Sequence, residues 1–198
     1  QYAMIKLNDF IKKVLRCYEN YEFHMIYYYL NELCAADLSA FYFSIIKDTM
    51  YVEHADNIRR RSIQTVLFNV VDILSRLIAP VLSFTCEEIY QEIPNYAKKE
   101  QSVFLSGFPK YNEKMENDDL INSFAKLDKI RTEVQKELEK ARQNKEIGQN
   151  LDAKIEIVLP ESINFEIFNK KGEIYKDYLY EIALFFIVSQ VKIVEKAD

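Results

Sequence analysis

Three consecutive arginines, Arg59, Arg60 and Arg61, stand at the start of a helix-like segment in a chain that is acidic overall. A guanidinium group binds carboxylates and phosphates through paired N–H donors, so the run could serve an internal ion pair or an external anion. The macrodipole of a helix disfavours cations at its N-terminus. Either carboxylates of this chain or an outside anion must therefore compensate the three charges.

Helical-wheel geometry separates the three arginines. At about 100° per residue, the apolar positions of residues 58–79 put Arg59 and Arg60 at the two edges of the core face. Arg61 falls on the opposite face, and so does Arg76 about four turns later. For Arg61 and Arg76 a solvated surface charge and an RNA phosphate contact remain equally open.

Two carboxylates of the preceding helix offer partners for the other arginines. Asp37 and Asp48 fall on the apolar stripe of that helix, where a lone carboxylate would be costly. The preceding helix ends where the next begins, so the sequence predicts an internal ion pair between Asp48 and Arg59 or Arg60. Replacing Asp48 by Lys is then expected to unfold or strongly destabilise the domain.

Residues for catalysis or metal binding do not form a recognisable pattern. His24 and His54 have no second histidine four residues away, and no glycine-rich phosphate loop is present. Cys17, Cys34 and Cys86 are widely spaced and read as buried thiols of a reducing compartment. We expect a non-catalytic chain without a metal site or cofactor of its own.

The aromatic segment "YEFHMIYYYL" could stack on nucleobases. Core packing is the stronger interpretation, because Phe23 and Tyr27 fall on the apolar stripe of residues 22–50. Tyr28 and Tyr29 point elsewhere and are expected to pack on neighbouring helices.

Composition sets limits on the class of protein. The chain has 198 residues, 49% of them hydrophobic, and a net charge of −5. It carries no apolar run of the roughly 20 residues needed to cross a bilayer and no signal peptide, so we expect a cytoplasmic protein without a membrane partner. The acidic charge argues against a surface wholly devoted to nucleic acid, but it permits a local basic site.

Periodicity predicts helices at residues 2–18, 22–50, 58–79 and 118–145, and a short one that begins near Thr85 and ends before Pro94. Thr85 and Glu88 match a capping box. The strings "AKIEIVL" and "LFFIVSQVKIV" read as strands, with a turn at Gly172 and a short helix between them. The fold class is therefore mainly α: an antiparallel helical bundle followed by a small α/β appendage.

The same pattern predicts the domain organisation. Residues 1–94 should form the bundle core, and the polar residues 95–117 a linker across the surface. Residues 118–147 should form a long helix that packs on the bundle, and residues 148–198 a small α/β subdomain.

Three segments of the sequence carry a family resemblance. They include "YENYEFHMIYYYLNELCAADLSAFYFSIIKDTMY" and "RRRSIQTVLFNVVDILSRLIAPVLSFTCEEIY". The first resembles the start of the anticodon-binding helical domain of bacterial-type isoleucyl-tRNA synthetases, and the second is similar to the next helix and turn of that domain. "IRTEVQKELEKARQNKEIGQNLDAKIEI" resembles a later family segment. Valyl relatives usually carry a C-D-W-Y-[LI]-E version of the second helix, from which Asp37-Leu38-Ser39 departs.

This resemblance implies a class I aminoacyl-tRNA synthetase that joins isoleucine to its tRNA with ATP and magnesium. Its H-I-G-H and K-M-S-K-S motifs, its editing domain and its C-terminal zinc module are not in this sequence. We therefore expect a fragment, with the catalytic and editing domains of the same polypeptide and the tRNA(Ile) anticodon stem-loop as partners, in a monomer.

Basic side chains on outer helical faces are the candidates for tRNA phosphates. They are Arg61, Arg76, Lys47, Arg131, Arg142 and Lys145. For each residue a solvated charge or a salt bridge within a helix is at least as good an interpretation. Two other hypotheses stay open: the equivalent region of a valyl or leucyl enzyme, and a helical scaffold that binds a protein partner.

Overall fold

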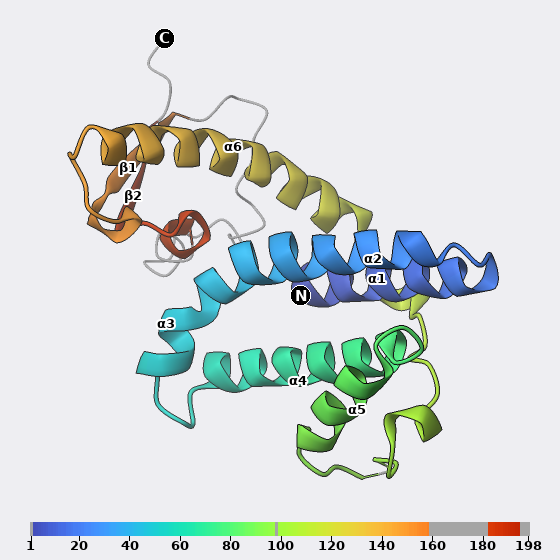
Figure 1. Ribbon diagram of the computed structural model, residues 1–198. Helices are drawn as coiled ribbons and strands as arrows, with labels where there is room; N and C mark the ends of the chain where they lie inside the picture. Colours follow the sequence, from blue (N-terminus) through green and yellow to red (C-terminus); the bar gives the residue numbers. More distant parts are fainter. Residues whose placement is uncertain (1, 98, 159–181, 195–198) are drawn as a thin grey trace. The chain divides into compact units, whose positions relative to one another are not determined.

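The computed structural model describes residues 2–97, 99–158 and 182–194 (Figure 1). The chain divides into two compact units, Gln1–Glu116 and Asn117–Asp198. The prediction of a mainly α fold with a small α/β part is confirmed. The domain boundaries differ from those expected, because the supposed linker belongs to the first unit and the long helix is grouped with the strands.

The first unit is a bundle of helices packed against one another (Figure 1). Its elements are α1 (Tyr2–Glu19), α2 (Phe23–Asn31), η1 (Glu32–Phe43), α3 (Ser44–Val52), α4 (Ile58–Ile78), α5 (Ser83–Glu92), η2 (Val103–Leu105) and η3 (Glu113–Met115). Helix α1 packs against α2 and α4, and α4 packs against α5. None of the helices in the described part of the chain has the length and apolar character needed to span a bilayer.

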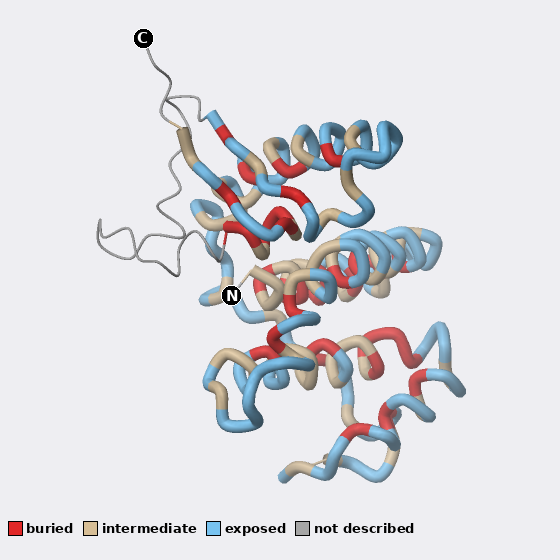
Figure 2. The backbone as a smooth tube through the Cα atoms, turned by 90° about the vertical axis from the view of Figure 1, so that its left-hand side faces the viewer, coloured by how far each residue is buried: buried red, intermediate tan, exposed pale blue. Residues whose placement is uncertain are grey.

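One hydrophobic core joins these helices. Leu7 and Val14 of α1, Ile26 of α2, Leu77 of α4 and Tyr90 of α5 are each at most 1% exposed. Buried positions recur along one side of each helix and exposed positions along the other (Figure 2), as the 3.6-residue period of an amphipathic helix requires. The Tyr18 hydroxyl donates a 2.9 Å hydrogen bond to the backbone carbonyl of Leu77, which ties α1 to α4.

The predicted helix of residues 22–50 is helical almost throughout, but its middle part, η1, is π-helical. In a π-helix the hydrogen bonds run from i to i+5, so each residue turns through a smaller angle than in an α-helix. A single α-helical wheel through the whole segment is therefore out of phase at its ends. Phe23 and Tyr27, predicted to lie on the core stripe, are 51% and 75% exposed, whereas Ile26 is buried.

Residues 95–97 and 99–116 belong to the first unit and pack on its helices. Val103 is 3% exposed and belongs to the core. Asn8 of α1 donates to the carbonyl of Asn112 at 3.0 Å and accepts from its N–H at 2.9 Å. The predicted capping box is wrong: α5 begins at Ser83, two residues before Thr85, and its N-cap makes no side-chain hydrogen bond.

The second unit combines α6 (Asp118–Gln143), η4 (Asn150–Asp152) and the strands β1 (Lys154–Val158) and β2 (Gln190–Val194). The strands pair in parallel, with Ile155 opposite Val191. The second predicted strand is shorter than expected, because residues 182–186 are helical. Most of the short helix predicted between Gly172 and Leu184 lies outside the described residues.

Candidate nucleic-acid interface

Groups for catalysis or metal binding do not gather in the described parts of either unit. No three His, Cys, Asp or Glu side chains among the described residues are placed to hold a metal ion. Cys17 and Cys86 are buried and Cys34 is partly buried. Burial raises the pKa of each of these thiols, so they are protonated and weakly nucleophilic at neutral pH.

The start of α4 is capped by a neutral amide. The Asn57 Oδ1 accepts hydrogen bonds from the backbone N–H groups of Arg59 at 2.8 Å and Arg60 at 3.2 Å. These bonds satisfy two of the donors that a helix start leaves open. The Arg60 guanidinium donates to the Glu53 carbonyl at 3.3 Å, so it helps to hold the turn between α3 and α4.

The ion pair predicted between Asp48 and Arg59 or Arg60 is not formed. Asp48 is exposed, and α3 buries Ile46 and Thr49 instead. Among the described residues Asp48 takes part in no ion pair. The physical reason is the π-helical winding of η1, which shifts the phase of the wheel and turns Asp48 away from the core.

Asp37 does have a partner, but it comes from α1. Its Oδ1 lies 3.4 Å from the Lys6 Nζ. Partial burial raises the pKa of Asp37, and the positive charge of Lys6 opposes that rise. Burying an unpaired carboxylate costs free energy, and the ion pair with Lys6 offsets that cost for Asp37. The pair also joins η1 to α1.

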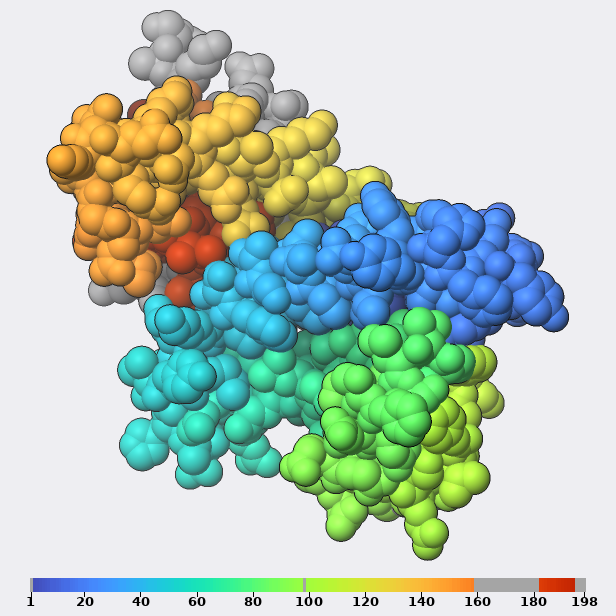
Figure 3. All heavy atoms as spheres, viewed as in Figure 1, coloured from blue at the N-terminus to red at the C-terminus, as the bar shows by residue number. Residues whose placement is uncertain are grey.

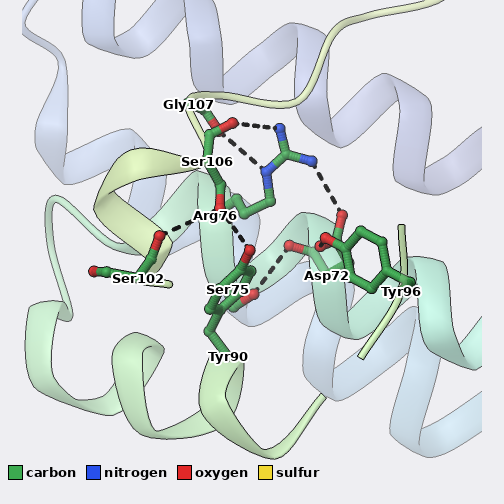
Figure 4. Close-up of polar contacts among 8 residues, drawn as sticks. All are labelled: Asp72, Ser75, Arg76, Tyr90, Tyr96, Ser102, Ser106 and Gly107. Carbon is green, nitrogen blue, oxygen red and sulfur yellow. Dashed lines mark hydrogen bonds and ion pairs between the residues drawn. The ribbon is translucent and has the colours of Figure 1, made fainter. Parts of the chain in front are cut away.

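Arg76 does not point outward, contrary to the expectation from the wheel (Figure 4). Its guanidinium donates to Asp72 at 3.1 Å, to the Ser106 carbonyl at 3.1 Å and to the Gly107 carbonyl at 3.1 Å. The wheel describes one helix in isolation, whereas here residues 102–107 fold over that face of α4. Arg76 therefore fastens a loop and is a poor candidate for phosphate binding.

Hydroxyl groups add further hydrogen bonds around Arg76 and the loop of residues 102–107 (Figure 4). The Tyr96 hydroxyl donates to Asp72 at 2.8 Å, and the Ser106 hydroxyl donates to the Tyr90 hydroxyl at 2.7 Å. Asp72 thus holds Arg76 on one side and Tyr96 on the other, which fixes both ends of the segment that follows α5.

Glu87 of α5 holds the same loop from the other side. Its Oε2 accepts from the Ser102 hydroxyl and from the Val103 N–H, both at 2.9 Å. Hydrogen bonds from Gln91, Val103 and Ser102 lower the pKa of Glu87, so this carboxylate is ionised at neutral pH.

Two predicted cations of the first unit remain exposed. Lys47 lies on α3 and Arg61 on α4, on the two helices that flank residues 53–57. In the described part of the chain neither side chain forms an ion pair. Both are therefore available to an external anion.

The three predicted cations of α6 and its end are placed differently. Arg131 is 7% exposed, so the expectation that it faces solvent is wrong. Arg142 is exposed; it forms an ion pair with Glu139 and donates to Asn150 at 2.6 Å. Helical periodicity alone cannot show which side of α6 the rest of its unit covers, and this is why Arg131 was misplaced.

Lys145 stands in the turn that ends α6. Its φ is 61°, and its N–H donates to the Arg142 carbonyl at 3.0 Å, while the Glu146 N–H donates to the Ala141 carbonyl at 2.9 Å. This is the Schellman arrangement, in which the left-handed residue is usually Gly. The helix thus ends at Gln143, two residues before the end predicted from periodicity, and the exposed Lys145 side chain is held in a defined turn.

Several aromatic side chains for which the sequence favoured core packing are exposed, among them Phe23, Tyr27 and Tyr28. Tyr21 has a φ of 57° and is 80% exposed, and its ring lies 6.1 Å from that of Phe23. Phe108 stacks on Tyr18 with ring centroids 5.1 Å apart. The signal was present in the sequence: residues 21–29 carry more aromatic side chains than one helical stripe can bury.

A helical bundle with exposed cations and exposed aromatic rings has the features of a domain that binds folded RNA, where cations meet phosphates and rings meet unstacked bases. The family described as "Anticodon-binding domain of tRNA ligase" matches residues 1–157. The chain belongs to this family.

Its relatives carry a more specific name. The chain is 39% identical over 195 residues, 98% of its length, to the isoleucine–tRNA ligase of Syntrophotalea carbinolica. It is 40% identical over 191 residues to that of Desulforamulus reducens and 37% identical over 201 aligned residues to that of Crocosphaera subtropica. The chain spans about a fifth of the length of these relatives.

Proposed function

We propose that the chain is the anticodon-binding part of an isoleucine–tRNA ligase and binds the anticodon stem-loop of isoleucine tRNA. The observation that carries this proposal is the similarity to isoleucine–tRNA ligases along almost the entire chain. Attachment of isoleucine, with ATP and magnesium, then belongs to other domains of the same cytoplasmic, monomeric polypeptide. Any zinc belongs to a further C-terminal module.

The exposed cations supply the electrostatic part of this function. Lys47, Arg61, Arg142 and Lys145 are exposed, and each can replace counterions on an RNA phosphate. Arg76 and Arg131 are removed from the candidates, because one is bound to backbone carbonyls and the other is buried.

The exposed aromatic rings supply a means of contact with the bases. An anticodon loop presents unstacked bases, which stack on aromatic side chains. Tyr21, Phe23, Tyr27 and Tyr28 are each at least half exposed and lie at the α1–α2 turn and along α2. We assign them as the stacking candidates for the anticodon loop.

A titration of the whole chain with isoleucine tRNA tests the proposal. With four phosphate contacts, affinity should fall by roughly two orders of magnitude between about 50 and 200 mM salt. The same tRNA with a mutated anticodon should bind more weakly. The double variant Lys47→Ala/Arg61→Ala should lose affinity and salt dependence, whereas the control Lys136→Ala/Lys140→Ala, which removes the same charge at two lysines that are not among the candidates, should change both less.

Three results would count against the proposal. Equal binding of isoleucine tRNA and its anticodon mutant would show that the chain does not contact the anticodon. Tighter binding of valine or leucine tRNA would favour an enzyme of that specificity. Absence of binding at low salt would leave a helical scaffold as the function of this chain.

A further inference from the structure

A long groove lies between α4 and α5. Its main part has a volume of 1290 Å³ and is seen in Figure 3 as a hollow between the teal and green parts of the surface. A second cavity of 380 Å³, which α2 and η1 also line, shares Val71 and Ile89 with it. Together they follow α4 from Arg61 to Ile78, which is about 25 Å at 1.5 Å per residue.

The floor of this groove is apolar. Val71, Leu82 and Ile89 are 39%, 45% and 43% exposed. Along α4, Leu67, Phe68 and Val71 line the groove and fall on one face at the three- and four-residue spacing with which one helix packs against another. Two helices therefore present an open seam of the kind that a third helix fills.

The walls of the groove differ in charge. Glu87, Glu88 and Glu92 of α5 line one side. Arg61 is at the end of the opposite wall. The carboxylates of Glu88 and Glu92 repel RNA phosphates and attract Lys or Arg side chains, so the α5 wall is unsuited to RNA, while Arg61 at the end of the opposite wall is a tRNA candidate.

We propose that the α4–α5 groove binds an α-helical protein segment with an apolar face and with Lys or Arg along the edge that meets α5. A volume of 1290 Å³ exceeds the range of about 300–1,000 Å³ typical of small-molecule pockets, which favours a macromolecular segment. An amphipathic helix laid in a groove uses apolar anchors at i, i+3, i+4 and i+7, the spacing that α4 offers. This function does not rest on tRNA binding, and the two sites have Arg61 in common.

The probe is a fluorescein-labelled helical peptide of about 18 residues, which matches the groove length at 1.5 Å per residue. It carries Leu at positions i, i+3, i+4 and i+7 and Lys on the flanks. Two control peptides have the same composition in scrambled order, or Glu in place of every Lys. In fluorescence anisotropy with the whole chain, the Leu/Lys peptide should bind at least about tenfold more tightly than either control.

Variants of the chain locate the contact. Glu88→Lys/Glu92→Lys should reverse the preference, so that the Leu/Glu peptide binds better than the Leu/Lys peptide; Glu87 is kept because it holds Ser102 and Val103. Glu133→Lys/Glu137→Lys on α6 makes the same change of net charge elsewhere and should leave the preference unchanged. Val71→Glu should weaken binding of both peptides, with folding verified by circular dichroism.

Several outcomes would overturn the proposal. If the scrambled peptide bound as tightly as the Leu/Lys peptide, an apolar helix face would not be what the groove recognises. If Glu88→Lys/Glu92→Lys left the peptide preference unchanged, the carboxylates of α5 would not contact the bound helix. Competition by tRNA that persists in the Arg61→Ala variant would make the groove part of the RNA site. Sedimentation that shows a dimer lost on Val71→Glu would make a second copy of the chain the occupant.

Discussion

In the described part of the chain, several polar contacts of the first unit join distant segments, whereas the ion pairs on the exposed side of α6 are local. Arg76 binds carbonyls about thirty residues away, and Asn8 binds Asn112 across 104 residues. On α6 each of three ion pairs spans three residues: Lys136–Glu133, Lys140–Glu137 and Arg142–Glu139.

This difference separates structural cations from available ones. An exposed pair within one helix contributes only about 0.3–0.5 kcal/mol, so its cation can be transferred to a phosphate at small cost. A guanidinium bound to several partners around a fastened loop cannot leave without exposing unpaired groups. Sequence position alone does not reveal which kind a given arginine is.

The largest expected effect tests the fastening by Arg76. Arg76→Ala should lower the free energy of unfolding by about 2 kcal/mol, because Asp72 and two backbone carbonyls lose their donor. Urea denaturation measures the change. The free energy of unfolding of Arg76→Lys should lie between those of the wild type and Arg76→Ala, since an ammonium group cannot reproduce the planar fork of a guanidinium. An unchanged unfolding midpoint in Arg76→Ala would show that the hydrogen bonds of Arg76 to Ser106 and Gly107 do not stabilise the fold.

The second test concerns the longest connection. Asn8→Ala should lower the free energy of unfolding by about 1.5 kcal/mol, because both hydrogen bonds to the Asn112 backbone are lost from a site that is 5% exposed at Asn8. Hydrogen exchange should report faster exchange at the Asn112 amide. Unchanged protection of that amide would contradict the role of Asn8.

A smaller, pH-dependent effect is expected at Glu87. Hydrogen bonds lower its pKa in the folded state, so its contribution to stability is present above the ordinary value of 4.5 and is lost as the pH falls through the lower, folded value. Glu87→Gln should therefore flatten the fall in stability between about pH 5 and pH 3. Thermal melts across that range measure it, with Glu88→Gln as the matched control; parallel curves for wild type and Glu87→Gln would refute it.

At Lys145 stability and tRNA affinity should move in opposite directions. Lys145→Gly relieves a left-handed backbone and should raise the free energy of unfolding by about 0.5 kcal/mol. Loss of the cation should weaken tRNA binding a few-fold and reduce the salt slope by about one. Lys145→Ala should show the weaker binding without the gain in stability, and equal stability of the two variants would exclude backbone strain.

The smallest effect is expected at Asp48. Because Asp48 is exposed and makes no ion pair with described residues, Asp48→Lys should change the free energy of unfolding by less than about 0.5 kcal/mol. Calorimetry measures this directly. A large loss of stability would restore the ion pair that the wheel predicted.

Local signals predicted the helical elements well. The expected helix at residues 58–79 is α4, Ile58–Ile78, and the one at residues 118–145 is α6, Asp118–Gln143. Apolar periodicity repeats within a few residues, so it can be read from one segment. The predicted cap at Thr85 was wrong, whereas the Asn117 side chain, for which no cap was predicted, caps α6.

Signals that depend on neighbours were misread. Phe23, Tyr27 and Asp48 were placed on the wrong face, because π-helical winding does not follow the 3.6-residue period. The second predicted strand was too long, because "LFF" suits a buried helix as well as a strand.

By itself the sequence determined the mainly α class, the order of the helices and the family, since these depend on periodicity and on residue types at fixed spacing. Only the tertiary structure decided that Arg76 fastens a loop, that Arg131 is buried and that Arg61 borders a groove with an acidic wall. The environment of a charged side chain is set by segments far away along the chain, and no local pattern encodes where those segments fold.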